Sequence, residues 1–372
     1  MKKTLVAMAT LSVVGSAFAD VDVSGGIKMY GVIDQAVTSQ DLTDPSVANR
    51  STNYRSLFAA AATSRIGFKG NRDLGNGVKG RIQAEIQVEP DNATQLPAKN
   101  RGTFVGISKE SAGEILLGTQ ETTAYEIFGM DVNGRVEYKP QVWRTTTSSD
   151  TQDRANNSLK YVSPSIGGFT AHVMRGFADT TNSASAYTSA GLKFNNDKLR
   201  AAFVVDQLTN TAGSYRFAGL VNAGPGKEGA TYSSTALAYA GSSSASITRN
   251  IGSISYDFGV ASVNYLYAKS YNSTTKAGSL TTHTAGIRIP YDDFAFALSY
   301  GGGTIDSYTT ASSGLAIAGD ATIKDTTFGL YYNLDKSTSF YLLGSTSTLS
   351  TGGGYVQAGK NVTTAIGARY NF

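Results

Sequence analysis

The stretch GRIQAEIQVE, residues 80–89, alternates without interruption between two kinds of side chain. Its aliphatic members are Ile82, Ala84, Ile86 and Val88, and its polar members are Arg81, Gln83, Glu85, Gln87 and Glu89. A period of two is typical of a β-strand with two different faces. In a soluble sheet the aliphatic face packs inward, whereas in a closed membrane barrel it meets lipid and the polar face lines the interior. The rest of the chain has to decide between these two environments.

The first nineteen residues are typical of an export signal. MKKTLVAMATLSVVGSAFA (1–19) has two lysines, an apolar run, and small residues at Ala17 and Ala19. We expect cleavage after Ala19, so that residues 20–372 form a mature chain of 372 − 19 = 353 residues. Without Lys2 and Lys3, 32 − 2 = 30 basic residues stand against 28 acidic ones. This near balance gives no reason to expect a nucleic-acid partner.

The composition favours strands and tight turns over helices. The chain has 41 glycines and 21 tyrosines, but 7 prolines, 1 tryptophan and no cysteine. The lack of cysteine excludes a disulfide scaffold, a thiolate nucleophile and a cysteine-based metal site. Beyond the export signal, no run approaches the ~18 apolar residues of a membrane-spanning helix. An exported β-protein of this length is a large sandwich, a solenoid or a barrel in the outer membrane.

Strand-like segments recur along the whole mature chain, and we count about sixteen. They lie near 22–38, 54–70, 77–89, 101–109, 113–119, 154–163, 168–177, 187–195, 197–207, 248–257, 259–271, 281–290, 293–303, 322–333, 337–348 and 359–372. An even number is typical of bacterial outer-membrane barrels. No repeat of fixed period accompanies these segments, which disfavours a solenoid or propeller.

The connections between these segments alternate in length. Short turns such as NRDLGNG (71–77), NND (195–197) and YDD (291–293) are followed by long polar loops. The loops lie near 39–53, 90–100, 120–153, 178–186, 208–247, 272–280, 304–321 and 349–358. Tight periplasmic turns and long extracellular loops are characteristic of membrane barrels. We therefore predict an all-β protein, a transmembrane antiparallel β-barrel of about sixteen strands in the cell outer membrane.

The last strand carries a further signal. VTTAIGARYNF (362–372) alternates and ends the sequence on Phe372, with Tyr370 on the same face. A terminal aromatic residue of this kind resembles the signal that outer-membrane barrels present to the barrel-assembly machinery. Tyrosines near other strand ends fit the interfacial aromatic girdles of such barrels.

Several motifs now resemble a known family, the trimeric general porins of Gram-negative bacteria of the neisserial and β-proteobacterial type. The matching stretches are MYGVIDQAV (29–37), SRIGFKGNRDLGNGVKGRIQAEIQVE (64–89), TFVGISKESAGEILLGTQ (103–120), RANNSLKYVSPSIGGF (154–169), GSISYDFGVASVNYLY (252–267) and GARYNF (367–372). Two features depart from the family. It often has Arg where Thr119 stands, and the segment AYEIFGMDVNGRVEYKPQVW (124–143) lacks the expected aromatic-rich pattern.

The resemblance implies a homotrimer whose third loop folds inward and narrows each channel. It also implies that this loop presents acidic groups opposite basic groups on the wall. The candidate loop follows residue 120, and its acidic residues are Glu121, Glu126, Asp131 and Glu137.

Strand parity indicates which wall residues face the interior. Ile66 and Phe68 are expected to face lipid, so Arg65 and Lys69 face inward. In the strand that contains residues 80–89, the same alternation places Lys79, Arg81, Gln83 and Glu85 inside. In RANNSLKYV the residues expected inside are Arg154, Asn156, Ser158 and Lys160. A charge that faces lipid near mid-membrane costs roughly 2–4 kcal/mol, which constrains these assignments. We expect Arg65, Arg81 and Arg154 to converge as the basic wall of the constriction.

A sixteen-strand barrel is wide enough to hold an aqueous channel. Opposed rings of charge orient small polar solutes and select ions by sign. We therefore expect passive diffusion of ions and small hydrophilic solutes, with a modest preference for anions. The expected surroundings are outer-membrane lipid, and no nucleic acid is expected.

Three alternatives compete with a general diffusion channel. An enzyme is disfavoured because neither His172 nor His283 has a serine two residues further on its own face, and no metal-ligating cluster stands out. No catalytic residue, metal or cofactor is therefore expected. A substrate-specific channel, or a surface adhesin or receptor barrel, stays open because of the long loop at 208–247. A soluble exported sandwich is the third alternative. Small residues expected to face lipid (Ala59, Ala61) give a weak hint of a trimer contact.

Overall fold

The computed structural model describes fifteen stretches of the chain. They are residues 21–24, 26–44, 50–58, 61–90, 99–126, 154–177, 186–211, 216–217, 237–238, 245–273, 279–306, 308–310, 316–317, 321–351 and 359–372. The expected export signal, residues 1–19, and the loop acids Asp131 and Glu137 lie outside these stretches.

Eighteen strands form one antiparallel sheet. They are β1 (Val21–Ser24), β2 (Ile27–Asp44), β3 (Arg50–Phe58), β4 (Arg65–Gly75), β5 (Val78–Gln87), β6 (Lys99–Lys109), β7 (Gly113–Glu121), β8 (Arg154–Val162), β9 (Phe169–Gly176), β10 (Ala186–Asn195), β11 (Leu199–Thr211), β14 (Ala245–Asp257), β15 (Ser262–Asn272), β16 (Leu280–Tyr291), β17 (Phe294–Ile305), β20 (Ala321–Asn333), β21 (Thr338–Thr351) and β22 (Gly359–Asn371).

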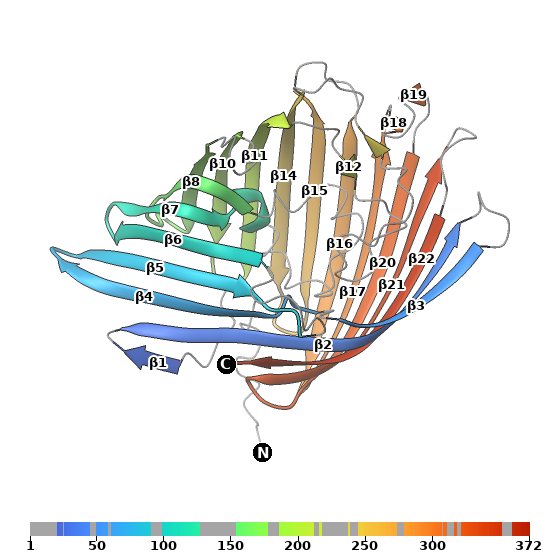
Figure 1. The fold of residues 1–372 in the computed structure, drawn as a ribbon, viewed down its shortest axis with the longest axis horizontal. Coiled ribbons are helices and arrows are strands. Elements are labelled where there is room, and N and C mark those ends of the chain that lie inside the picture. Colours follow the sequence, from blue (N-terminus) through green and yellow to red (C-terminus); the bar gives the residue numbers. More distant parts are fainter. Residues whose placement is uncertain are drawn as a thin grey trace.

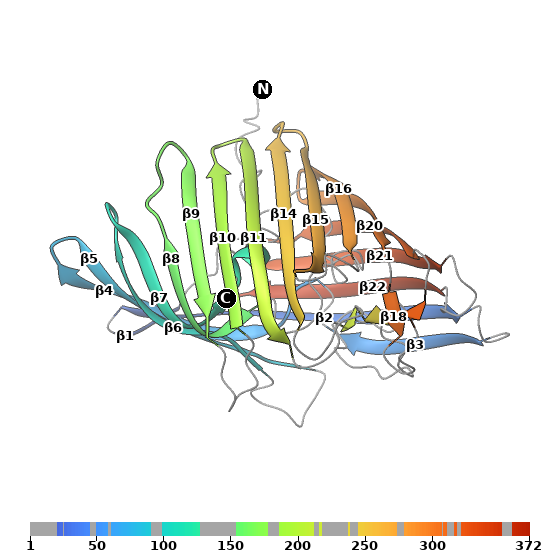
Figure 2. The same cartoon turned by 90° about the horizontal axis from the view of Figure 1, so that it is seen from above.

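The sheet closes on itself, because β22 pairs with β2. β1 is a short strand that pairs with β2 alone. β3 and β4 pair with successive parts of β2, so together they cross the barrel wall once. The described strands therefore make 18 − 1 − 1 = 16 crossings of a closed antiparallel barrel. Strands β8–β11 and β14–β16 form one curved wall, and β20–β22 with β2 and β3 form the facing wall (Figures 1 and 2). The predicted fold is confirmed.

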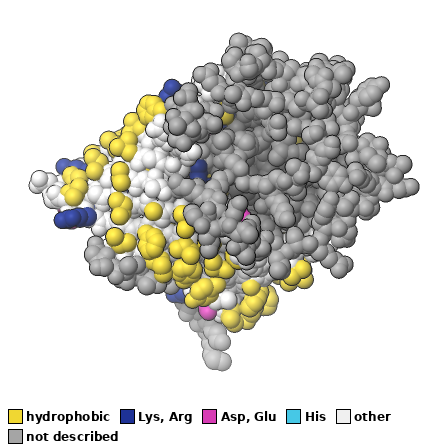
Figure 3. Space-filling model, in the orientation of Figure 1, with side chains coloured by type: hydrophobic (Ala, Val, Ile, Leu, Met, Phe, Trp, Pro, Cys, Tyr) yellow, Lys and Arg dark blue, Asp and Glu magenta, His cyan; other side chains and the backbone are white. Residues whose placement is uncertain are grey.

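The aliphatic face of the alternating strands points away from the barrel interior. In β5, Ile82 is 46% exposed whereas Glu85 is 9% exposed. In β17, Phe294, Phe296, Leu298 and Tyr300 are exposed while the intervening alanines and serine are buried. Hydrophobic side chains accordingly spread over the outer surface of the described strands, with Lys and Arg near its edges (Figure 3). This is the arrangement of a barrel in lipid, in which closure leaves no unpaired edge.

One end of the barrel carries the short turns. Between β4 and β5, three successive residues have positive φ, namely Gly75 (87°), Asn76 (53°) and Gly77 (73°). Glycine and asparagine tolerate this conformation, and the turn reverses the chain within a few residues. Asp292 (φ 54°) reverses the chain between β16 and β17 in the same way. The strand ends that the long connections join lie at the opposite end.

Two predicted strands differ from the structure. The segment expected at 22–38 is interrupted before Gly26 (φ 82°) and then continues to Asp44. The segment expected at 54–70 is divided into β3 and β4, because residues 61–64 leave the sheet. Ser64 bridges this gap by donating to the Asp34 backbone oxygen at 3.0 Å and accepting from the Asp34 amide at 2.9 Å. Val88 was expected to face lipid, but it lies beyond the end of β5 and is buried, with its amide bonded to Ser64.

The end of the chain completes the closure of the barrel. Phe372 exchanges backbone hydrogen bonds with Gly31 of β2, at 2.7 and 3.1 Å. A Cβ atom at Gly31 would lie 2.3 Å from the Phe372 ring, so the ring packs directly over this glycine. Tyr370 points outward, and its ring stacks on that of Phe372 at a centroid distance of 6.3 Å.

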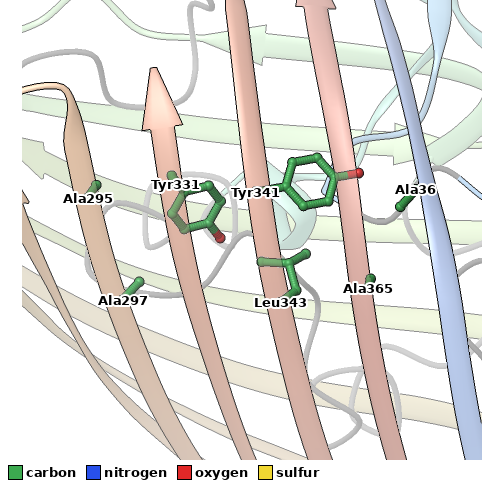
Figure 4. Close-up of a cluster of buried hydrophobic side chains, with 7 residues drawn as sticks. All are labelled: Ala36, Ala295, Ala297, Tyr331, Tyr341, Leu343 and Ala365. Atoms are coloured by element: carbon green, nitrogen blue, oxygen red, sulfur yellow. The ribbon is translucent and has the colours of Figure 1, made fainter. Parts of the chain in front are cut away.

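An apolar cluster lies on the inner side of the wall from β17 to β2 (Figure 4). Its members are Ala36, Ala295, Ala297, Tyr331, Tyr341, Leu343 and Ala365. Ala61, in the segment that leaves the sheet, packs against this cluster, and its amide donates to the Asp34 carboxylate at 3.3 Å. Ala61 therefore lies inside the barrel, which corrects the expectation that it faces lipid; Ala59 lies outside the described residues.

A small second sheet joins two of the long connections. It consists of β12 (Arg216–Phe217), β13 (Leu237–Ala238), β18 (Tyr308–Thr310) and β19 (Ala316–Ile317). β13 pairs with β18, so the connection after β11 meets the connection after β17. In the described part of the chain, no helix is long and apolar enough to cross a membrane.

Candidate functional site

The chain turns into the barrel directly after β7. Residues 123–126 form one helical turn, and Thr122 caps it by accepting the Tyr125 amide on its side-chain oxygen at 3.2 Å. Thr122, Thr123 and Ala124 are fully buried. The methyl group of Ala124 packs with inward residues of β11, β14 and β15. The expected inward turn of this loop is thus present as far as the structure describes it, which is to Glu126.

A glycine allows the inward turn to approach the wall. A Cβ atom at Gly191 of β10 would lie 2.9 Å from Thr123 Cγ2 and 2.5 Å from Val204 Cγ2. Both separations are shorter than a normal carbon–carbon contact, so any larger residue at this position would displace the turn.

A carboxylate on β5 organises the first charge cluster. Glu85 accepts the Arg101 Nε hydrogen at 2.8 Å and the Tyr30 hydroxyl at 3.0 Å. Arg65 Nε lies 3.5 Å from its second oxygen. The three partners satisfy the charge and the hydrogen-bonding capacity of a carboxylate that is largely shielded from water. Both arginine side chains are thereby fixed against the inner wall.

Arg101 is the residue of this cluster that strand parity missed. Its outward neighbours in β6 are Val105 and Ile107, so strict alternation would also place Arg101 outside. The pairing of β5 with β6 shifts at Glu85. Glu85 pairs with Gly102, but the next residue of β5 pairs with Asn100, so Arg101 is an extra residue of β6 with no partner in β5. This β-bulge turns the arginine inward. An outward arginine would cost roughly 2–4 kcal/mol near mid-membrane. This cost is the one sequence-based reason to expect Arg101 inside.

Arg154 joins the first cluster from β8. Its Nη2 lies 3.2 Å from Glu121 Oε1, and its guanidinium lies 5.5 Å from the centre of the Tyr125 ring. Arg65 and Arg101 also interact electrostatically with Glu121 and Tyr125. Arg65, Arg101 and Arg154 therefore surround the base of the inward turn. We name these three arginines with Glu85 and Glu121 the arginine cluster.

Glu126, at the end of the inward turn, forms the second charge cluster. Its carboxylate pairs with Lys160 of β8, and with Lys193 of β10 at 2.6 Å. His172 Nδ1 lies 3.3 Å from the same carboxylate. Burial acts to raise the pKa of Glu126, but Lys160, Lys193 and His172 together hold it well below its usual range. The ionised carboxylate therefore ties the turn to the wall, and we name this group the lysine anchor.

The structure separates Arg81 from the other two arginines that were expected to converge. Arg81 pairs with Glu114 near the short-turn end of β5. In the β4–β5 register it faces Asn71, whereas Arg65 faces Gln87, six residues further along β5. Six residues of strand correspond to about 20 Å. This corrects the expectation of a three-arginine wall that includes Arg81.

The remaining predicted wall residues lie at various depths. Lys69 Nζ lies 4.9 Å from the centre of the Tyr30 ring, Gln83 is half-buried beside Gly102, and Lys79 is exposed near the short turns. Asn156 was expected inside but is exposed, because the β7–β8 pairing shifts there and Asn157 adopts a positive φ of 49°. Asn156 accepts the Thr119 hydroxyl at 3.3 Å on this exposed face.

Comparison with known proteins identifies the barrel. A family model described as Gram-negative porin matches residues 4–348. The chain belongs to the Gram-negative porin family. It is an outer-membrane β-barrel, and the expectation of a channel protein rather than an enzyme agrees with this membership.

Several curated relatives are porins as well. The chain is 28% identical over 228 residues to outer membrane porin protein 32 of Delftia acidovorans, covering 57% of this chain and 62% of that protein. It is 25% identical over 409 residues to an outer membrane porin protein of Bordetella pertussis, covering all of both chains. It is 31% identical to the major outer membrane protein P.IB of Neisseria gonorrhoeae over 205 residues, covering 55% of this chain and 56% of that one. The matches thus span somewhat over half the length of the Delftia and Neisseria proteins.

Solved structures agree on the fold. The anion-selective porin from Comamonas acidovorans superposes with a TM-score of 0.67 at 20% identity, covering 93% of this chain and 99% of that one. Outer-membrane expressed OmpT of Vibrio cholerae superposes with a TM-score of 0.63 at 15% identity, covering 94% and 99%. At these identities the likeness concerns the fold alone.

Proposed function

We propose that this porin forms a water-filled channel for passive diffusion of ions and small hydrophilic solutes, with a weak preference for anions. The charge around the inward turn carries this proposal. The arginine cluster has three cations and two carboxylates, and the lysine anchor has two cations and one carboxylate. For these described residues the sum is 5 − 3 = +2, without His172. A small positive excess at a narrowing favours anions modestly and still lets cations pass.

The geometry also supports a local field beside the inward turn. Arg65 and Arg101 are held on the wall formed by β4 and β6, while Glu121 is carried at the base of the inward turn. A polar solute that passes this side of the channel meets charges of both signs, which orient it. No covalent step or stored energy is needed, because the solute moves down its own gradient.

We also propose that the functional form is a homotrimer. The outward faces of β5, β6 and β7 expose aliphatic side chains, namely Ile82, Ile86, Val105, Ile107, Ile115 and Leu117. Several other strands expose aromatic residues near their ends, for example Phe169, Tyr256, Phe294 and Tyr370. Aromatic girdles mark a lipid interface, and their replacement by aliphatic residues is consistent with a protein contact. One similar structure, of Vibrio cholerae OmpT, is described as a trimer form.

Liposome swelling tests the proposed function against a substrate-specific channel. Proteoliposomes should swell in neutral sugars at rates that fall smoothly with solute size, whatever the stereochemistry of the sugar. Rates that differ strongly between sugars of equal size would contradict general diffusion and favour a specific channel. Absence of swelling in every solute would contradict a pore altogether.

A further inference from the structure

A histidine lies between the two lysines that hold the end of the inward turn. His172 of β9 points into the barrel and is 7% exposed, while both of its chain neighbours are exposed on the outer face. In register, Lys160 of β8 lies one inward position toward the long-connection end, and Lys193 of β10 lies one inward position toward the short-turn end. The three basic residues therefore follow a diagonal across adjacent strands, in steps of roughly 7–8 Å, with the histidine in the middle.

All three residues of this diagonal face one carboxylate. Lys160 pairs with Glu126 Oε1. Lys193 Nζ lies 2.6 Å from Oε2, and His172 Nδ1 lies 3.3 Å from the same oxygen. Lysine is charged at neutral pH, whereas histidine changes its charge between about pH 5 and 8. Two of the three contacts to the carboxylate are therefore permanent, and the third depends on protonation.

The third contact is close but is not a hydrogen bond. Within the described part of the chain, His172 Nδ1 has no hydrogen-bond partner. Its distance of 3.3 Å from the carboxylate exceeds the roughly 2.7–2.9 Å of a charge-assisted bond. A neutral imidazole carries one ring hydrogen, and a protonated imidazole carries a hydrogen on both nitrogens. A protonated ring can therefore donate to the carboxylate after a small movement.

The ring lies beside the point at which the inward turn approaches the wall most closely. The register partners of His172 are the neutral residues Val162 of β8 and Gly191 of β10. Gly191 is the position at which an added Cβ atom would lie 2.9 Å from Thr123 of the turn. A contact that pulls Glu126 toward β9 thus acts directly on the turn.

The charged groups that face the ring come from the turn and from each neighbouring strand. They are Glu126 from the turn, Lys160 from β8 and Lys193 from β10. Glu121, at the base of the turn, acts on the cluster through its electrostatic interaction with Glu126. With a neutral ring the lysine anchor has a charge of 2 − 1 = +1, and with a protonated ring it has 3 − 1 = +2.

We propose that His172 is a proton-dependent positioning residue of the channel. In an acidic medium it adds a third contact to Glu126, which steadies the inward turn, and it adds a positive charge to the lumen. Both effects belong to the protonated ring, so they are present at low pH and are lost as the pH rises. The inference rests on the proposed channel function, but it concerns the change of selectivity with pH and not its sign.

The sequence makes a specific test possible, because it contains two histidines, His172 and His283. His283 of β16 is exposed on the outer face, so H283Q is the matched control for H172Q. The chloride-to-potassium permeability ratio and the open-channel noise of each full-length porin are recorded in planar bilayers of neutral lipid, from about pH 7.5 to about pH 5. Other groups that titrate in this range are the same in all these proteins.

The parent and H283Q should show a permeability ratio that rises about two- to threefold on acidification, because one added charge beside an ion in a watery passage has a modest effect. H172Q should lose this rise. In E126Q the ratio should still rise, but the noise should no longer fall, because the ring has no carboxylate to hold. An equal rise in the parent and H172Q would overturn the proposal, as would noise that falls in E126Q as it does in the parent.

A second measurement does not depend on the folding of H172Q. In H283Q the sole remaining histidine is His172, so magnetic resonance of isotope-labelled histidine in micelles reports its protonation alone. The midpoint should match that of the permeability rise within about half a pH unit. A ring whose charge does not change over this range would overturn the proposal. A channel that prefers potassium at every pH would contradict the proposed anion preference, yet a shift toward chloride that H172Q loses would still support the role of His172.

Discussion

At the residue scale, Glu85 fixes the positions of two arginine side chains on the inner wall. Its carboxylate binds Arg65, Arg101 and Tyr30 at once, so the guanidinium groups cannot swing along the channel. Burial of this carboxylate is tolerated because its partners replace the lost water. The net charge of the three ionised groups is positive, which leaves a fixed positive patch on the inner wall.

Replacement of Arg101 should reduce the anion preference. We expect R101Q to lower the chloride-to-potassium permeability ratio by about two- to fivefold, because one charge beside a permeating ion in a watery passage is worth about 1 kcal/mol at most. The matched control is R81Q, which removes an arginine about six residues along the strand and should leave the ratio nearly unchanged. The zero-current potential in a salt gradient measures both. An equal change in the two variants would remove the arginine cluster from the ion path.

Loss of Glu126 should loosen the inward turn. In E126Q, Lys160 and Lys193 lose their shared partner and the turn loses its main ionic tie to the wall. We therefore expect noisier single-channel currents and a higher anion preference, since two cations stay in the lumen without a carboxylate. E110Q, in an exposed short turn, is the control. Quiet, parent-like currents from E126Q would show that the lysine anchor does not hold the turn.

At the element scale, the inward turn depends on a position in a neighbouring strand that carries no side chain. Gly191 on β10 provides the space in which Thr123 meets the wall. The apolar contacts of Ala124 with β11, β14 and β15 then hold the turn on the inner surface. The inward turn is therefore held by strands that are far from β7 in the sequence.

Alanine at Gly191 should displace the inward turn. The added Cβ would lie 2.9 Å from Thr123 Cγ2, so we expect G191A to lose about 1–3 kcal/mol of stability and to change the conductance. G252A is the control, because its Cβ would lie no closer than 3.9 Å from another atom. Urea unfolding in detergent micelles and single-channel conductance report the two effects. Unfolding midpoints and conductances that match in both variants would contradict the close approach.

Alanine at Gly31 should weaken the closure of the barrel. Its Cβ would lie 2.3 Å from the Phe372 ring, which would have to leave its place over β2. We expect G31A to lower the yield of folded protein and to destabilise it by about 1–3 kcal/mol. The fraction that keeps its folded mobility in unheated SDS gels measures the yield. G302A, with no contact closer than 3.7 Å, should fold as the parent does.

The alternation of side chains was sufficient to predict the strands, their inward and outward faces and the inward positions of Arg65 and Lys160. It failed where the sheet departs from regular pairing. Arg101 turns inward through a bulge, and Asn156 turns outward where β7 and β8 change register. Sequence parity also gives no height along a strand, which is why Arg81 seemed to belong with Arg65. Glu126 and Lys160 were each predicted, but Lys193 was not, and the contact of all three needed the folded turn.

At the scale of the whole molecule, one closed sheet separates two kinds of surface. The outer surface is aliphatic and aromatic in its middle and carries exposed lysines, such as Lys324 and Lys360, toward one end. The inner surface carries the arginine cluster and the lysine anchor on one side and an apolar cluster with Tyr331 and Tyr341 on the other. Ions that pass the inward turn therefore meet most of the described charge on the side from β4 to β10.

The zero-current potential of the unmodified porin tests this account most directly. The purified protein is inserted into a planar bilayer of neutral lipid, with potassium chloride concentrated on one side. The account predicts a potential whose sign shows chloride to be the more permeant ion, shifted toward zero in the triple variant R65Q/R101Q/R154Q. A potential of the opposite sign, showing a preference for potassium, would contradict it.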